Sequence, residues 1–215
     1  MKVLLDHYDD LLRGMWVTLK LTGVSALIAL LLGTVLAVMR VSPVPTLRWA
    51  GTAYVAVFRN TPLTLMLVFS VFGLPQLGLN LSFFSRAAIA CSVYTAAFFC
   101  EAIRSGINAV PIGQAEAARA IGLRFRQVLS VVVLPQAFRA SIPPLISFLI
   151  ALTKNTAIAE FFGVPEATSH FDALANKYES ALYWLFAGVA LEYVVVVLSI
   201  AGVGRWLEKR WRVLT

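Results

Sequence analysis

A lysine stands in a short polar run, Thr153-Lys154-Asn155-Thr156, inside a stretch that is otherwise apolar and long enough to cross a bilayer. An ammonium group beside an amide and hydroxyls suits the carboxylate of a small molecule. A charge at the bilayer centre costs about 2.5–3.5 kcal/mol on insertion scales, so a retained charge is a functional candidate. We therefore expect this run to contact a substrate. In the alternative interpretation, Lys154 extends to the outer membrane surface or pairs with Glu160.

Two acidic residues stand in other apolar stretches. Glu192 has apolar neighbours on both sides, so we expect it either to line a cavity or to hydrogen-bond a neighbouring helix. If Glu192 lines a transport cavity, its carboxylate repels an anionic substrate. Glu101 precedes Arg104 by three residues, a spacing that permits a local ion pair on a helix. For this pair we favour a structural role over a role in gating.

Signatures of an enzyme are missing from the sequence. It contains no Gly-x-x-x-x-Gly-Lys-Ser/Thr loop for nucleotide phosphates and no Gly-x-Ser-x-Gly turn for a serine nucleophile. His7 and His170 are isolated from each other, so no zinc-ligand pattern is present. We expect no catalytic residue, no metal site and no cofactor in this chain.

The composition is that of a membrane protein. Of the 215 residues, 60% are hydrophobic and 13% are charged, whereas soluble domains average about 45–50% apolar and about 25% charged residues. One span takes roughly 20 apolar residues, so we expect a single membrane domain over residues 1–215 and no sizeable soluble domain. The net charge of +7 indicates basic cytoplasmic loops rather than a nucleic-acid partner.

Five apolar stretches are expected to be membrane-spanning helices, which makes the fold all-α. They cover residues 16–39, 62 to 74 or 79, 83–103, 136–158 and 181–203. The second stretch is short, and the preceding segment 46–58 is expected to be a helix near the membrane surface or an extension of that span. The fourth is expected to be interrupted at Pro143-Pro144 and again at residues 153–156.

The first span is expected to remain as an anchor, because it is too long for the core of a cleavable signal peptide. Ser25, Ala29, Gly33 and Ala37 recur in it every four residues. Such a stripe of small side chains allows a neighbouring helix to approach closely. Cys91 and Cys100, nine residues apart in the third span, cannot pair within one helix and are expected to be small core residues.

The distribution of basic residues predicts the orientation. With an external N-terminus, twelve of the eighteen Lys and Arg residues fall on cytoplasmic segments. These are Arg40, Arg48, Arg59, Arg104, Arg119, Arg124, Arg126, Arg139, Arg205, Lys209, Arg210 and Arg212. The positive-inside bias thus favours an N-out, C-in arrangement, with the loop of about residues 106–133 in the cytoplasm.

We expect that loop to contain a short polar helix. Pro111 precedes it, good helix formers follow, and Gly122 stands where a helix end favours a left-handed residue. Glu116 lies in the first turn, where its charge suits the helix dipole, and it has the spacing to pair with Arg119. The small alanines on one flank would let the helix enter a groove of a partner protein. The alternative is an interfacial helix whose arginines meet anionic lipid.

The spacing of the loop resembles the signature cytoplasmic loop of ABC-importer permeases: Glu-Ala-Ala, three residues, Gly, nine residues, an aliphatic residue, one residue, Leu-Pro. Here these elements are Glu116-Ala117-Ala118, Gly122, Val132 and Leu134-Pro135. Further segments resemble permeases for polar amino acids, and within that family the likeness is greatest to glutamate-uptake permeases of actinobacteria. They are Met39-Arg40-Val41-Ser42-Pro43, Phe58-Arg59-Asn60-Thr61-Pro62-Leu63, Ser105-Gly106-Ile107, Leu134-Pro135-Gln136-Ala137 and Leu152-Thr153-Lys154-Asn155-Thr156.

The resemblance implies a type I importer permease fold in a bacterial cell membrane. It implies three kinds of partner: an ATPase dimer that binds ATP and Mg²⁺, a second permease subunit (identical or different), and an extracellular amino-acid-binding protein. The cytoplasmic helix would couple ATP hydrolysis to transport. The residues expected to meet the ATPase are Gly113, Gln114, Ala115, Glu116, Ala117, Ala118, Arg119 and Gly122. The rival interpretations are an ion-gradient-driven secondary transporter and a membrane scaffold that transports nothing.

Overall fold

The computed structural model describes residues 1–211, and its regular elements in that range are all helical. They are α1 (Lys2–Asp6), α2 (Tyr8–Val41), α3 (Pro45–Asn60), α4 (Leu63–Val68), the π-helix η1 (Phe69–Gly73), α5 (Leu74–Gln76), α6 (Phe83–Asn108), α7 (Ile112–Ala120), α8 (Phe125–Gln127), the π-helix η2 (Val128–Val133), α9 (Leu134–Asn155), the 3₁₀-helix η3 (Thr156–Phe162), α10 (Ala167–Lys177), the 3₁₀-turn η4 (Glu179–Ala181) and α11 (Leu182–Arg210). Arg212, which the topology argument counted, lies outside the described residues.

Four segments are long and apolar enough to cross a bilayer, and a bent pair of helices passes the same test only when its two parts are taken together. The four are 8–41, 83–108, 125–162 and 179–210; the pair joins α3 to the segment 63–76. The expected all-α architecture is therefore confirmed. The spans at the two ends of the chain are longer than predicted, because polar residues such as Asp9 and Glu208 continue the helices beyond the apolar stretches.

The second span differs from the prediction. Residues 46–58 do not extend it in a straight line, because α3 packs beside α2 and α6 and the chain then turns by 101° into α4. The turn follows from Pro62, whose ring disfavours helical backbone at the preceding residue. Thr61 accordingly has the extended angles φ −92° and ψ 130°.

The stripe of small residues packs α2 against α6, as predicted. Ser25, Ala29 and Ala37 are fully buried. At Gly33 an added Cβ atom would lie 2.9 Å from Phe99 Cβ and 3.0 Å from the Ala96 carbonyl oxygen. Larger side chains on this face would therefore separate the two helices.

The fourth span has one of its two predicted interruptions. Helix α9 continues through Pro143 and Pro144, so the break expected there is wrong. The two prolines free the carbonyl groups of Arg139 and Ala140, and membrane helices tolerate proline where the surrounding bundle satisfies such groups. The second interruption lies where expected, because α-helix changes to 3₁₀-helix at Thr156.

A buried carboxylate joins three helices near the N-terminal end of α2. Glu166 caps α10 by accepting hydrogen bonds from the backbone N–H groups of Thr168 (2.8 Å) and Ser169 (3.1 Å). It also accepts bonds from the Thr18 hydroxyl on α2 (3.1 Å) and the Tyr193 hydroxyl on α11 (2.9 Å). Burial raises the pKa of Glu166, while these four donors act in the opposite direction.

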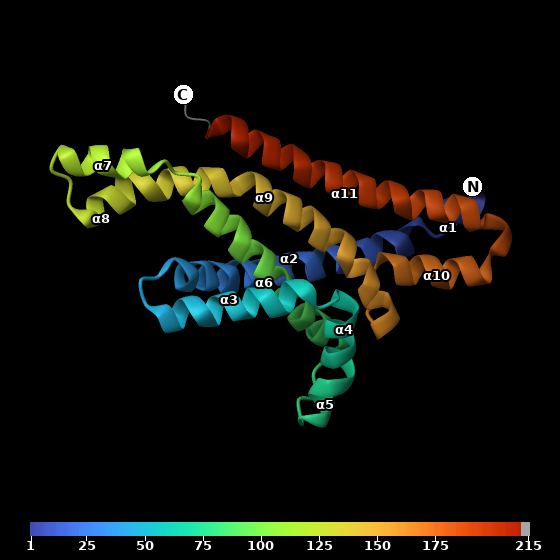
Figure 1. Cartoon of the computed structure of the whole chain (residues 1–215). Helices are drawn as coiled ribbons and strands as arrows, with labels where there is room; N and C mark the ends of the chain where they lie inside the picture. The colour runs from blue at the N-terminus through green and yellow to red at the C-terminus, as the bar shows by residue number, and fades with distance from the viewer. Residues whose placement is uncertain (212–215) are drawn as a thin grey trace.

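The two ends of the bundle differ in content. Figure 1 shows the N-terminus and α10 at one end, with α7, α8, the α2–α3 turn and the C-terminal end of α11 at the other. The charge distribution predicts that the α7 end faces the cytoplasm. The N-terminus would then lie outside.

Helices α6 and α9 cross closely at Gly106, which provides a test of the packing. A Cβ atom there would overlap Ser141 Oγ and lie 2.9 Å from the Ser141 backbone nitrogen. We expect Gly106→Ala to cost about 1–3 kcal/mol of stability because the helices must separate. The matched control is Gly202→Ala, whose Cβ would meet no atom within 4 Å.

The measurement is the midpoint of thermal unfolding in detergent, followed by size-exclusion chromatography. Gly106→Ala should lower the midpoint by several degrees, and Gly202→Ala should not change it. Equal midpoints for the two variants would contradict the close crossing.

Candidate functional site

Two hollows lie against α6, one beside α3 and the other beside α9, and the surface that they form together is here named the cleft. They share Phe98 as a lining residue. The first, here named the Asn155 hollow, has a volume of about 140 Å³ and is lined by Tyr94, Thr95, Phe98, Phe148, Ala151, Leu152 and Asn155. The second, the Arg59 hollow, has a volume of about 420 Å³ and is lined by Arg40, Thr52, Val55, Ala56, Arg59, Asn60, Phe98 and Glu101.

Aromatic rings form much of the wall of the Asn155 hollow. The Tyr94 and Phe98 ring centroids are 5.0 Å apart, and Phe98 and Phe148 are 5.3 Å apart across α6 and α9. Asn155, at the last turn of α9, contributes an amide to this largely apolar surface. Ligand sites commonly combine apolar walls with a few placed polar groups.

The polar run 153–156 does not converge on this hollow. Thr153 and Thr156 are fully buried, and their hydroxyls donate to the carbonyl oxygens of Leu149 (2.9 Å) and Thr153 (2.7 Å). Lys154 is exposed and lines a different hollow, of about 450 Å³, between the end of the fourth span and Tyr193 on α11. Successive residues on an α-helix point about 100° apart, so Lys154 and Asn155 face separate surroundings.

Neither the hydrogen bond considered for Glu192 nor the ion pair considered for Lys154 is observed within residues 1–211. Glu192 is buried, and neither of its carboxylate oxygens has a hydrogen-bond partner within residues 1–211. It does not line the Asn155 hollow or the Arg59 hollow. In the same part of the chain, no ion pair joins Lys154 to Glu160.

Glu101 is the centre of a charge cluster that joins three helices. Its Oε2 accepts a hydrogen bond from Arg104 at 3.0 Å, which confirms the predicted local pair. Its Oε1 pairs with Arg40 from α2 and lies 3.7 Å from an Arg59 nitrogen on α3. Sequence reasoning missed Arg40 and Arg59 as partners, because they stand 61 and 42 positions away and no local spacing connects them.

The loop between α6 and α9 has the predicted helix and glycine end. Helix α7 begins after Pro111 and ends with Gly122 in the left-handed region at φ 87°. The Gly122 N–H donates to the Arg119 carbonyl oxygen (2.9 Å) and the Leu123 N–H to that of Ala118 (3.1 Å). These bonds satisfy carbonyl groups that a helix end otherwise leaves free.

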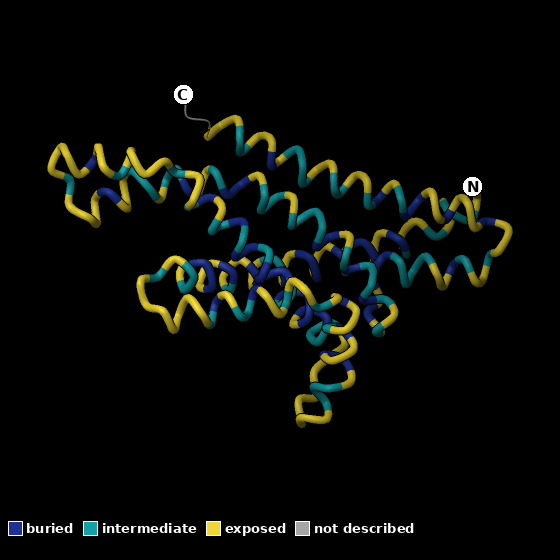
Figure 2. Tube along the Cα trace, in the orientation of Figure 1, coloured by how far each residue is buried: buried dark blue, intermediate teal, exposed yellow. Residues whose placement is uncertain are grey.

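Most of the residues expected to meet a partner are exposed on this loop. Figure 2 shows the exposure along α7; the exposed residues are Gly113, Gln114, Glu116, Ala117, Arg119 and Gly122. Ala115 is half-buried. Ala118 differs from expectation: it is buried within its own chain, where α7 packs against η2, so it supports the loop and is not a free contact.

The helix has a second surface feature that the sequence reasoning missed. Ile112, Ile121 and Phe125 are exposed by 77%, 79% and 69%, so apolar side chains border the polar surface of α7. No ion pair joins Glu116 to Arg119 in the described part of the chain, which leaves both charges free at this surface.

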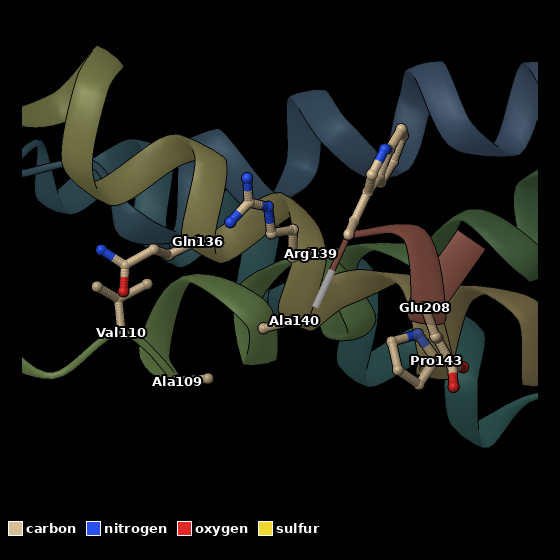
Figure 3. Close-up of a pocket in the computed structure, with 8 residues that line it drawn as sticks. Ala109, Val110, Gln136, Arg139, Ala140, Pro143 and Glu208 are labelled. Atoms are coloured by element: carbon tan, nitrogen blue, oxygen red, sulfur yellow. The ribbon is translucent and has the colours of Figure 1, made fainter. Parts of the chain in front are cut away.

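A third hollow, the Arg139 hollow, lies where the loop joins the bundle. It has a volume of about 430 Å³ and is lined by Ala109, Val110, Gln136, Arg139, Ala140, Pro143, Glu208 and Trp211. Figure 3 shows its walls coming from the end of α6, the start of α9 and the C-terminal end of α11. Both ends of the loop are therefore attached to membrane-spanning helices beside one another.

The charge cluster predicts a large effect for Glu101→Gln. The neutral amide leaves Arg40, Arg59 and Arg104 without a counter-charge, and breaking a buried pair costs about 3–5 kcal/mol. The Arg40 and Glu101 side chains are 13% and 19% exposed, so we expect the loss of stability at the lower end of that range.

Thermal unfolding of the purified protein checks this expectation, with the exposed Glu179→Gln as the matched control. Glu101→Gln should lower the midpoint well below that of the control. If its stability equals that of wild type, Glu101 does not hold the three helices together.

Comparisons with known proteins agree with this architecture. The family described as binding-protein-dependent transport system inner membrane component matches residues 29–213. The chain is 44% identical to the glutamate transport system permease protein GluC of Corynebacterium efficiens, with 95% of each chain covered. It is 39% identical to the arginine transport system permease protein ArtQ of Bacillus subtilis, covering 93% of this chain and 91% of that one.

Among solved structures, an amino acid ABC transporter crystallised with histidines superposes with a TM-score of 0.89 at 29% identity, covering 96% of both chains. This chain therefore has the same helix arrangement as a subunit of that transporter.

Proposed function

Because the chain belongs to the family of binding-protein-dependent transport system inner membrane components, we propose that it is the permease subunit of an ATP-driven importer of polar amino acids, with glutamate as a substrate. The two transport systems named above carry glutamate and arginine, and the first is the more similar. The observation that carries the proposal is helix α7, which is exposed, is followed by Gly122, and lies in the loop that connects the membrane-spanning helices α6 and α9.

In this proposal α7 docks into a groove of a separate ATPase. Its exposed polar face and the bordering side chains Ile112, Ile121 and Phe125 form the contact surface. When ATP binding closes two ATPase subunits, they push α7. Since the loop connects to α6 and α9, the push reorients the helix that runs along the cleft and the helix beside its Asn155 hollow. ATP and Mg²⁺ belong to the ATPase, and this chain carries out no chemical step.

The substrate path in this proposal is the cleft along α6. One chain provides only part of a wall around it, so a second permease subunit, identical or different, closes the path from the opposite side. An extracellular binding protein delivers the amino acid to it. Asn155 is then the residue of the polar run best placed to contact the substrate, because it lines the cleft beside Tyr94 and Phe98.

Glutamate as substrate is supported by the charges around the cleft. Three arginines surround one glutamate in the cluster at Glu101, so the net charge there is positive. Glu192, whose carboxylate would repel an anion, lies outside both hollows of the cleft. An ion-gradient-driven transporter remains the competing function, and it requires no partner at α7.

The coupling role predicts that changes on α7 release the ATPase. Glu116→Lys reverses an exposed charge, and Gly122→Pro replaces a residue at φ 87° with one restricted to about −65°. Both variants should fold in the membrane but lose the ATPase on purification. The matched control is Glu179→Lys, a charge reversal on an exposed residue just after α10, the helix that Figure 1 shows at the opposite end of the bundle.

Co-purification with a tagged permease measures the result directly. We expect at least a tenfold drop in the ATPase recovered with either α7 variant and no change with the control. Full recovery with both variants, or uptake by the permease alone along a proton or sodium gradient, would sink the proposal.

The separation of Asn155 from Lys154 predicts different consequences for uptake. Asn155→Ala removes a polar group from the cleft wall, and we expect glutamate uptake by the assembled complex to fall about tenfold, the effect of about 1.4 kcal/mol. The direct contact proposed for Lys154 predicts that Lys154→Ala abolishes uptake too. The measurement is the initial uptake rate of each variant in reconstituted vesicles. A loss in Asn155→Ala alone places the substrate path in the cleft, and a loss in both variants supports the direct contact of Lys154 as well. Unchanged uptake in Asn155→Ala would contradict the contact assigned to Asn155.

A further inference from the structure

We propose that Arg59 forms a second, inner binding site in the cleft, where its guanidinium binds a carboxylate of the amino acid on its way to the cytoplasm. This inference rests on the proposed transport function, and it assigns a substrate contact to a residue outside the polar run at 153–156. The site is the Arg59 hollow, with a volume of about 420 Å³ between α2, α3 and α6.

The first argument is the charge balance. The side chains of Arg40, Arg59 and Arg104 converge on Glu101, which has a single negative charge. Within residues 1–211 no other ion pair is formed by any of the three arginines. A cluster with two surplus positive charges attracts an anion most strongly where water is partly excluded.

The second argument is that Arg59 is the least engaged of the three arginines. Glu101 Oε1 is already closely paired with Arg40, whose side chain is 13% exposed. Arg59 lies 3.7 Å from the same oxygen, and its side chain is 44% exposed. A guanidinium has five N–H donors in a planar fork that matches a carboxylate. Arg59 therefore lines the hollow with donors that its single 3.7 Å contact to Glu101 does not use.

The third argument is the position of Arg59 along the cleft. Its guanidinium carbon lies 5.5 Å from the centroid of the Phe98 ring. Phe98 lines both hollows, so Arg59 stands next to the boundary with the Asn155 hollow. An amino acid that leaves the Asn155 hollow toward the α7 end passes Phe98 and meets Arg59 next.

The hollow also offers an acceptor for the ammonium group of an amino acid. The Asn60 Nδ2 group donates to the Ala56 carbonyl oxygen at 2.7 Å, which leaves the Asn60 side-chain oxygen free of that bond. Asn60 and Arg59 both line the hollow. A donor fork and an amide oxygen side by side fit the two charged groups of an α-amino acid.

The test uses the complete transporter: this chain, its partner permease, the ATPase and the binding protein, reconstituted in vesicles. Three variants are compared with wild type: Arg59→Gln, Arg59→Lys and Arg48→Gln. Arg48 is the matched control because it lies on the same helix, is exposed, and makes only a 3.5 Å hydrogen bond to the Ser42 carbonyl oxygen. ATP-dependent glutamate uptake by wild type tests the proposed function separately.

Two quantities are measured. One is the uptake rate relative to the ATPase rate stimulated by the loaded binding protein. The other is binding of radiolabelled L-glutamate to the purified, nucleotide-free complex, with unlabelled L-glutamine and 4-aminobutyrate as competitors. L-glutamine retains only the α-carboxylate, and 4-aminobutyrate retains only the distal one, so the competitor whose effect Arg59→Gln abolishes identifies the carboxylate that is bound.

For Arg59→Gln we expect glutamate binding and uptake per ATP to fall at least tenfold, as for loss of a charge-assisted hydrogen bond. Stimulated ATPase activity should stay within twofold of wild type. Arg59→Lys should recover part of the binding because it keeps the charge, and Arg48→Gln should match wild type.

Three results would overturn the inference. The first is wild-type binding and uptake in Arg59→Gln. The second is a parallel fall of uptake and ATPase activity in both Arg59 variants, which identifies Arg59 as a structural connection between α3 and α6. The third is that Arg59→Gln fails to assemble, while Arg59→Lys assembles but shows no specific binding of radiolabelled L-glutamate.

Discussion

Glu101 supplies the negative charge on which the rest of the cleft depends. A guanidinium inside a membrane-spanning bundle is costly unless an acid neutralises it or water reaches it. Glu101 accepts contacts from arginines on α2, α3 and α6, and in this way it joins three helices at one point. The shared carboxylate offsets part of the cost of three guanidinium groups beside one hollow, where the net charge is still positive.

Close helix packing connects the loop to this cleft. Helix α6 is continuous from Phe83 to Asn108, so one rigid rod carries the cleft residues Phe98 and Glu101 and then leads into the loop that contains α7. Gly33 and Gly106 let α2 and α9 lie directly against the α6 backbone. In the proposed mechanism, a displacement at α7 would reach the cleft through packed backbone, which deforms less readily than long side chains.

The features predicted correctly from the sequence are those set by neighbouring residues. The α7 helix with Gly122 at its end, the small-residue face of α2 and the Glu101–Arg104 pair all follow from local spacing. The sequence did not reveal Arg40 and Arg59 as partners of Glu101, because that contact depends on how three helices pack. It also grouped Lys154 with Asn155 because they are adjacent, whereas helical geometry directs them to different hollows. At Pro143 and Pro144 the local rule predicted a break, and packing in the bundle overrode it.

The central claim is that work done on α7 by a separate ATPase reaches the cleft along α6. Site-directed cross-linking from Ala117, which is exposed on α7, tests this most directly. With Ala117→Cys in the assembled transporter, the account predicts a cross-link to the ATPase whose yield changes when ATP is bound and when it is hydrolysed. Labelling of this cysteine only from the outside of sealed cells, or a complex that imports glutamate without any such cross-link, would contradict it.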